Sequence, residues 1–185
     1  MTETVQMFSA LLATLAALGA LVVFIAVFLG ARGDVLLAGI REVAHWLAFS
    51  VAAAAMIGSL YFSEVAEFVP CKLCWYQRIA MYSLAIILVI ATVRRDRAIA
   101  PYAMVLAALG AGIAGYHWLL ERWPSLDTGT CSADAPCSVP YFEVFGFVSL
   151  AFMAFSAFVT VLVFLWVVSP ASAATIETES ESVPH

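Results

Sequence analysis

The chain has 185 residues, of which 64% are hydrophobic and only 11% are charged, and its mean hydropathy is +1.01. This composition excludes an ordinary soluble domain, so we expect the lipid bilayer to be the main solvent of the fold. The formal net charge of -5 identifies no binding partner, because three acidic residues, Glu177, Glu179 and Glu181, lie close to the carboxyl end.

Five long apolar segments follow one another along the chain, at residues 7–29, 43–62, 75–93, 99–120 and 144–168. Each is close to the roughly 20 residues that a membrane-spanning helix needs. In hydrocarbon a helix satisfies its own backbone hydrogen bonds, so we predict an all-α integral membrane protein with five transmembrane helices. We expect no cleaved signal peptide in the first segment, because residues 1–6 contain no Lys or Arg.

The short loops differ in their content of positive charge. Five arginines follow the first and third segments, namely Arg32, Arg41, Arg94, Arg95 and Arg97. Because loops rich in Lys and Arg stay in the cytoplasm, we predict an extracytoplasmic amino terminus. The loops at 62–74 and 121–143, and with them all four cysteines, then lie outside. The Ser- and Glu-rich tail, 169–185, is predicted to be disordered and cytoplasmic.

The four cysteines form two pairs, Cys71-Lys-Leu-Cys74 and Cys131-Ser-Ala-Asp-Ala-Pro-Cys137. Paired cysteines on the oxidising side of a membrane favour thiol–disulfide chemistry. A zinc site is the first alternative, but the two spacings are not those of a zinc ribbon, and we predict no metal. Two static structural disulfides are the second alternative, and a C-x-x-C at the start of a helix argues against it.

Cys74 is expected to lie immediately before the third helix, whose free amide groups and dipole stabilise a thiolate. Lys72 and Arg78 add positive charge nearby. Arg78 follows Cys74 by four residues, so the two side chains should share a helix face about one turn apart. The alternative for Arg78 is an interfacial arginine that reaches toward lipid head groups.

His117 lies about one turn before the outer end of the fourth segment. A polar side chain inside a membrane helix is costly and usually has a partner or a role, such as donating to a quinone carbonyl or relaying a proton. The alternative is a histidine that bonds only to a neighbouring helix or to water.

The stretch Pro70-Cys71-Lys72-Leu73-Cys74-Trp75-Tyr76-Gln77-Arg78 resembles the signature of the DsbB family of disulfide-bond formation proteins. The later C-x5-C loop, followed by one more helix, is similar to the Gram-positive members often called BdbC. The similarity spans roughly residues 43–168 and implies a four-helix bundle over that range. Residues 1–30 would then add one extra N-terminal transmembrane helix, which the family pattern does not contain.

The resemblance also implies an activity, that of a quinone-dependent protein-disulfide oxidoreductase in the cell membrane. Such a protein reoxidises a DsbA-like thioredoxin-fold partner and passes the electrons to ubiquinone or menaquinone. By position, Cys131 and Cys137 match the partner-facing pair, and Cys71 and Cys74 match the quinone-proximal pair. Arg78 and His117 match residues near the quinone.

Two other classes of protein stay open on the sequence. A vitamin K epoxide reductase homologue also couples loop cysteines to a C-x-x-C in a helical bundle. There the loop cysteines come first in the chain, whereas here Cys71 and Cys74 come first, which disfavours this class. A non-enzymatic membrane scaffold with two inert disulfides is the other alternative.

Overall fold

The computed structural model describes residues 2–29, 31–127, 129, 131 and 135–168. Its helices are α1 (Thr2–Phe28), α2 (Ala31–Glu64), α3 (Lys72–Arg94), α4 (Ala100–Arg122) and α5 (Leu150–Val168), with a short 3-10 helix, η1 (Pro124–Leu126), after α4. All five α-helices are long and apolar enough to cross a membrane, and the described residues contain no strand. The predicted all-α fold with five transmembrane helices is therefore confirmed. The tail at 169–185, predicted to be disordered, lies outside the described residues.

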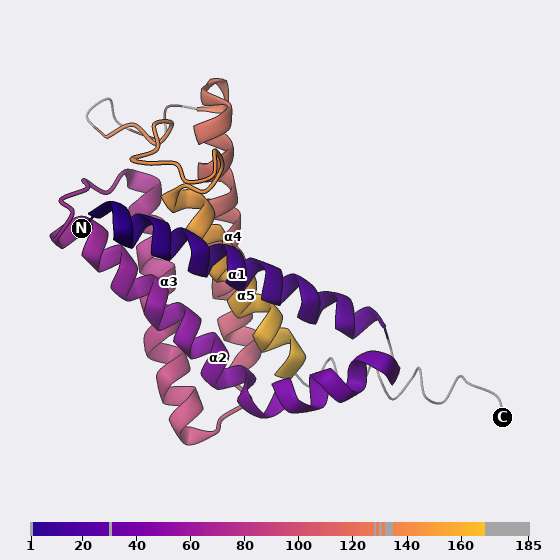
Figure 1. Ribbon diagram of the computed structural model, residues 1–185. Helices are drawn as coiled ribbons and strands as arrows, with labels where there is room; N and C mark the ends of the chain where they lie inside the picture. The colour runs from indigo at the N-terminus through magenta and orange to yellow at the C-terminus, as the bar shows by residue number, and fades with distance from the viewer. Residues whose placement is uncertain (1, 30, 128, 130, 132–134, 169–185) are drawn as a thin grey trace.

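Helices α2 to α5 form a closed four-helix bundle, in which α2 contacts α3, α3 contacts α4, α4 contacts α5 and α5 returns to α2. The extra helix α1 lies outside this ring and packs on α2 and α5, as Figure 1 shows. In consequence α5 is the most enclosed helix, with no exposed residue along its length. The other four expose large apolar side chains, such as Leu15, Ile57, Ile86 and Leu109, to the surface that lipid would cover.

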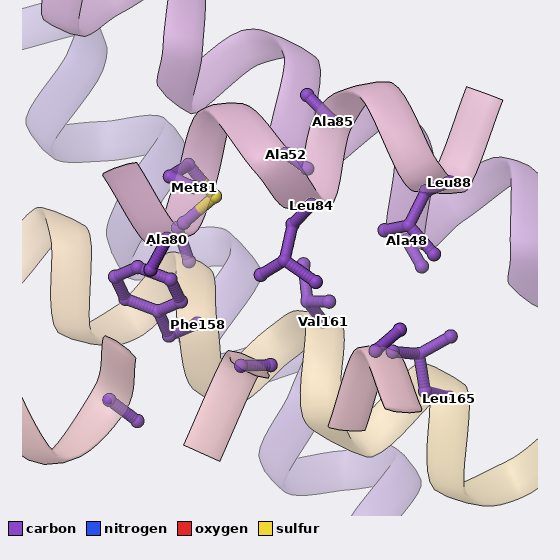
Figure 2. Packing of buried hydrophobic residues seen from close by; sticks show 14 of the residues in the cluster. Ala48, Ala52, Ala80, Met81, Leu84, Ala85, Leu88, Phe158, Val161 and Leu165 are labelled. Atoms are coloured by element: carbon purple, nitrogen blue, oxygen red, sulfur yellow. The ribbon is translucent and has the colours of Figure 1, made fainter. Parts of the chain in front are cut away.

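The bundle core is built from small side chains on some helices and large ones on others. Ala48 and Ala52 of α2, together with a row of small residues on α4, allow close helix approach. Leu84 and Leu88 of α3 and Phe158, Val161 and Leu165 of α5 fill the space between. Figure 2 shows these side chains converging from α2, α3 and α5. Such packing fixes the spacing of the helices that carry the cysteines.

Two helices, α2 and α5, begin six or more residues away from the start that the hydropathy predicts. The apolar segment predicted at 144–168 is helical only from Leu150, because Val144 and Val148 pair across a turn in which Gly146 has a positive φ of 74°. The Ser149 side chain then accepts from the Phe152 amide, as a residue preceding a helix commonly does. Helix α2 is longer than the predicted 43–62 and begins at Ala31.

The two cysteine-bearing loops lie at the same end of the bundle (Figure 1). The ring of Phe68 stacks on that of Tyr141 at a centroid distance of 4.5 Å, and the Tyr141 hydroxyl donates to the Val69 carbonyl at 2.7 Å. An ion pair of 2.8 Å between Arg122 and Glu143 fastens the second loop to the end of α4. These contacts hold the two loops against each other.

Candidate functional site

All four cysteines belong to one packed cluster at the end of α3 and α4, in which Leu73 and Leu120 are also buried. Cys131 and Cys137 are joined in a disulfide, whereas Cys71 and Cys74 are free thiols whose Sγ atoms lie 3.0 Å apart. The structure therefore brings together the two pairs that are separated by almost 60 residues in the sequence. Thiol–disulfide exchange between the pairs requires this proximity.

Cys71, rather than Cys74, occupies the position before helix α3. The helix begins at Lys72, and the Cys71 sulfur accepts from the Cys74 backbone amide, so Cys74 lies within the first turn. The prediction that Cys74 precedes the helix is thus wrong by about one turn, because hydropathy does not register a polar first turn. The neighbouring Cys74 thiol lowers the pKa of Cys71 well below its usual range. Burial opposes this shift, and His117 reinforces it.

His117 reaches across from α4 to the cysteine pair. Its Nε2 lies 3.7 Å from the Cys71 sulfur, and its Nδ1 lies 2.9 Å from the side-chain nitrogen of Gln77. Since an amide nitrogen only donates, Nδ1 accepts, and a neutral His117 carries its proton on Nε2, facing the sulfur. The ring is 5% exposed. Gln77 therefore orients the histidine for proton exchange with Cys71.

A cavity of about 390 Å³ lies between α1, α2, α3 and α5. Its volume falls within the range of about 300–1,000 Å³ that is usual for small-molecule sites. Most of the wall is apolar, and most of its polar side chains come from α2 and α3, among them Cys74, Gln77, Arg78, Ser59, Ser63 and Tyr82. Of the cysteine pair only Cys74 lines this cavity, so it is the sulfur available to a ligand bound there.

Arg78 is 8% exposed and lies in the wall of the large cavity. Its guanidinium donates to the Ser59 and Tyr82 hydroxyls, each at 3.0 Å, and to the Ser63 hydroxyl. The Trp75 ring lies 5.1 Å from the guanidinium carbon. Among the described residues no carboxylate pairs with Arg78, so its positive charge remains available to an anion that forms in the cavity.

A smaller cavity of about 150 Å³ lies on the other side of the cysteine pair, beneath the disulfide loop. Cys71, Cys74, His117 and Glu121 line it, together with loop residues such as Pro136. Cys74 thus borders both cavities, whereas Cys71 borders only the smaller one. His117 does not line the larger cavity. Its position therefore favours a proton-relay role over contact with a ligand bound there.

Sequence reasoning missed Gln77 and Glu121. Glu121 follows His117 by four residues and therefore shares its helix face, which is a signal that the sequence carried. Its carboxylate accepts from the Ser149 hydroxyl. Gln77 stands inside the motif, but its partner is on another helix, and only the fold brings the two together.

The sulfurs of Cys71 and Cys74 and a ring nitrogen of His117 lie within 4.8 Å of one another, close enough to share a metal ion. A closed structural zinc site needs a fourth protein ligand. The other two cysteines are joined to each other and do not supply it. The arrangement therefore suits proton and disulfide exchange better than a structural metal.

Comparison with known proteins places these features in a family. The family described as "Disulfide bond formation protein DsbB" matches residues 40–168. Disulfide bond formation protein C of Bacillus subtilis is 42% identical over 126 residues, which cover 68% of this chain and 91% of the relative. A probable disulfide formation protein C of Halalkalibacterium halodurans is 42% identical over 119 residues, covering 64% and 85%.

A probable disulfide formation protein C 1 of Bacillus anthracis is 40% identical over 129 residues, covering 69% of this chain and 93% of the relative. No solved structure gives a significant match. The family match contains α3, α4, α5, most of α2 and all four cysteines. The chain therefore belongs to the DsbB family of disulfide bond formation proteins, and is a multi-pass membrane thiol–disulfide oxidoreductase.

Proposed function

We propose that the protein reoxidises an extracytoplasmic dithiol protein of thioredoxin fold, of the DsbA type, and passes the electrons to a membrane quinone, ubiquinone or menaquinone. The observation that carries this proposal is the position of Cys74. It belongs to the packed cluster of four cysteines and also borders an apolar cavity that contains an unneutralised arginine.

Disulfides alone do not suffice for this activity. A strongly oxidising partner has a reduction potential near about -120 mV, whereas ordinary structural disulfides lie below about -300 mV. Oxidation of such a partner by such a disulfide would be uphill by roughly 180 mV, or ~8 kcal/mol. A stronger electron acceptor is therefore required, and in a membrane a lipid-soluble quinone is a suitable one.

The residues around the large cavity fit a quinone. A flat, lipid-soluble ring needs apolar walls, which α1, α2 and α5 provide, and a cation near an oxygen atom that gains charge, which Arg78 provides. A bound quinone would accept two electrons and two protons. The cavity lies within the membrane-spanning part of the helices, where such a ligand is dissolved.

The order of the sulfur atoms supports a direction for the electrons. A partner thiolate would attack the Cys131–Cys137 disulfide, which leaves that pair reduced and the partner oxidised. Once Cys71 and Cys74 are joined in a disulfide, a loop thiolate would attack Cys71, which borders only the smaller cavity beneath the loop. Cys74 would leave as the thiolate, at the wall of the large cavity and one turn from Arg78. The second loop thiolate would resolve the mixed disulfide, which restores Cys131–Cys137 and leaves Cys71 and Cys74 reduced. Reoxidation of Cys71 and Cys74 to a disulfide would then release two electrons at this wall.

Protons must be transferred along with the electrons, because reduction of a quinone consumes two of each. His117 faces Cys71 at 3.7 Å and is oriented by Gln77, so its Nε2–H would donate to the Cys71 thiolate and could return a proton to that sulfur. Glu121 lines the same small cavity and lies one turn further toward the outer loop. His117 and Glu121 would let protons pass between the cysteine pair and the side of the cysteine loops, so that the two protons a quinone takes up balance the two that the partner dithiol gives up.

The partner-facing cysteine is proposed to be Cys131. It is half-buried, whereas Cys137 is 1% exposed, so an incoming protein thiolate reaches Cys131 more easily. The loops that carry the cysteines would face the extracytoplasmic side and the arginine-rich turn between α3 and α4 the cytoplasm.

Anaerobic turnover tests the function. Purified protein is mixed with a reduced thioredoxin-fold dithiol protein and a short-chain quinone, and both thiol loss and quinone absorbance are followed. We expect one dithiol oxidised for each quinone reduced, and a mixed disulfide through Cys131 when Cys137→Ala blocks its resolution. Dithiol oxidation that continues without quinone beyond the equivalents held in the protein's own disulfides, or a partner adduct only through Cys71 or Cys74, would overturn the proposal.

A further inference from the structure

One face of α1 forms a wall of the large cavity. Ser9, Leu12, Ala13 and Ala16 all line it, and their spacing of three and four residues places them on a single stripe of the helix. The opposite walls come from α2, α3 and α5. The cavity is therefore not an internal space of the four-helix bundle, since the extra helix closes its side.

The two halves of α1 have different roles in packing. The second half is anchored to the bundle, because Ala20, Val23 and Ala26 pack with Leu37 of α2 and Val163 of α5. All four cavity residues lie in the first half. These four side chains border an open volume, whereas Ala10 in the same half is fully buried and does not line it. The four side chains therefore set the width of the cavity without being needed to hold α1 in place.

This wall lies outside the part of the chain that is matched to the family. The family match begins at residue 40, after the whole of α1. The 126 aligned residues cover 91% of the Bacillus subtilis relative, so the rest of that relative is only about a tenth as long as the aligned part. This remainder is too short for a helix of 27 residues. A cavity wall made by α1 is thus a property of this chain that the matched relative does not share.

We infer that α1 is the specificity-determining wall of the quinone site, and that the short side chains of Ala13 and Ala16 set the ring width that the site accepts. This inference rests on the proposed quinone activity. A methyl group at each position leaves room for a flat ring beside Cys74 and Arg78. A larger side chain at either position would enter the same space from the side of α1.

The test compares Ala13→Phe with Leu15→Phe. Leu15 lies two residues away on α1 and is 64% exposed, so the control adds an aromatic ring to the same helix on the lipid side. We expect Ala13→Phe to raise the apparent KM for quinone by at least about tenfold, the loss that overpacking one large side chain brings. The increase should be greater for a two-ring naphthoquinone than for a single-ring benzoquinone. The rate of disulfide exchange with the partner should be unchanged, and Leu15→Phe should behave as wild type.

A second measurement does not depend on turnover or on the folding of a variant. Wild-type protein is irradiated with an azido-quinone, and the labelled residues are mapped by mass spectrometry. We expect label within residues 9–16, together with label on α3. Wild type that reduces quinone, with label absent from α1 and an unchanged KM in Ala13→Phe, would overturn the inference and leave the proposed activity intact. Wild type that neither binds nor reduces quinone would overturn both.

Discussion

At the scale of single residues, Arg78 is the group on which quinone chemistry should depend most. Replacing it with Ala removes a buried positive charge from the wall of the large cavity. Loss of one preorganised donor typically costs about 3 kcal/mol of transition-state stabilisation, or on the order of a hundredfold in rate. We expect Arg78→Ala to impair quinone reduction by that factor while the first exchange with the partner continues. Single-turnover kinetics separate the two steps.

Two further variants control this experiment. Arg78→Lys should restore only part of the rate, because a point charge does not reproduce the planar donors that now bond to Ser59 and Tyr82. Arg122→Ala also removes an arginine, but one that pairs with Glu143 away from the large cavity, and should leave the KM for quinone unchanged. Intact quinone kinetics in Arg78→Ala would remove the arginine from the site.

Cys71 should react as a thiolate at neutral pH. The Cys74 thiol lowers the pKa of Cys71, with His117 reinforcing the shift. An ordinary thiol alkylates faster as the pH rises toward about 8.5, whereas alkylation of Cys71 should already have reached its plateau below neutrality. Because the pKa of Cys71 is lower in the fold than in an unfolded chain, the Cys71 thiolate stabilises the reduced fold. This stabilisation is fully present above the ordinary thiol pKa and is lost as the pH falls through the lowered pKa. Mass spectrometry of iodoacetamide-treated protein gives the rate at each pH.

His117→Ala should shift this alkylation profile to higher pH, since one of the groups that lower the pKa is removed. Gln77→Leu should produce a smaller shift in the same direction, because the ring keeps its place on α4 but loses the bond that orients it. A Cys71 rate that still rises tenfold per pH unit above neutrality in the wild type would contradict the assignment.

Single residues were predictable from the sequence where their neighbours in the chain reveal their chemistry. Cys74 follows Cys71 by three residues and precedes Arg78 by four, and helix geometry relates these neighbours. The hydrogen bonds between Gln77 and His117 and between Glu121 and Ser149 join residues that are 40 and 28 positions apart, so no local pattern contains them. For the same reason the sequence placed His117 near a quinone, a role that stays a prediction, while the structure places it next to Cys71.

At the scale of the helices, the contact between α4 and α5 depends on Gly110. A Cβ added there would overlap the ring of Phe158, which is fully buried. Although alanine favours a helix over glycine by about 1 kcal/mol, overpacking typically costs about 1–3 kcal/mol. We expect Gly110→Ala to lower the Tm of the detergent-solubilised protein.

Gly112 provides the matched control, because an added Cβ meets nothing within 4 Å on the same helix. Gly112→Ala should leave the Tm unchanged or raise it. An equal change in Tm for the two variants would show that α4 and α5 are not packed as closely as described.

The helices themselves were predictable because long uncharged segments have only one stable form in hydrocarbon. Their ends were not. Hydropathy extended the last segment back to Val144, where a turn through Gly146 and the Ser149 side chain stop the helix. It also began the third segment at Trp75, three residues late, and so misplaced Cys74 relative to the start of α3.

At the scale of the whole molecule, the direction of insertion decides whether the cysteines meet an oxidising compartment. Starting from a protein whose four cysteines are replaced by Ala, we expect Val139→Cys to be labelled by a membrane-impermeant maleimide on intact cells. Asp96→Cys, in the turn between α3 and α4, should be labelled only after the cells are opened. Both positions are exposed, so access to the reagent depends on the side of the membrane. The reverse pattern would invert the proposed orientation.

The position of α1 was also beyond prediction. Its length and hydropathy identified a membrane helix, but not that it would close the cavity beside Cys74, since this depends on the surfaces of α2 and α5. The central claim is that electrons leave the molecule from the Cys71–Cys74 pair through that cavity.

Counting electrons tests this claim most directly. Fully reduced protein, freed of reductant, is mixed anaerobically with excess quinone, and the quinone reduced per protein is measured from its absorbance. We expect two equivalents for the wild type and one for the double variant Cys131→Ala/Cys137→Ala. We expect none for Cys71→Ala/Cys74→Ala, whose remaining loop pair has no route to the cavity. Quinone reduction by this last variant at the wild-type rate would contradict the account.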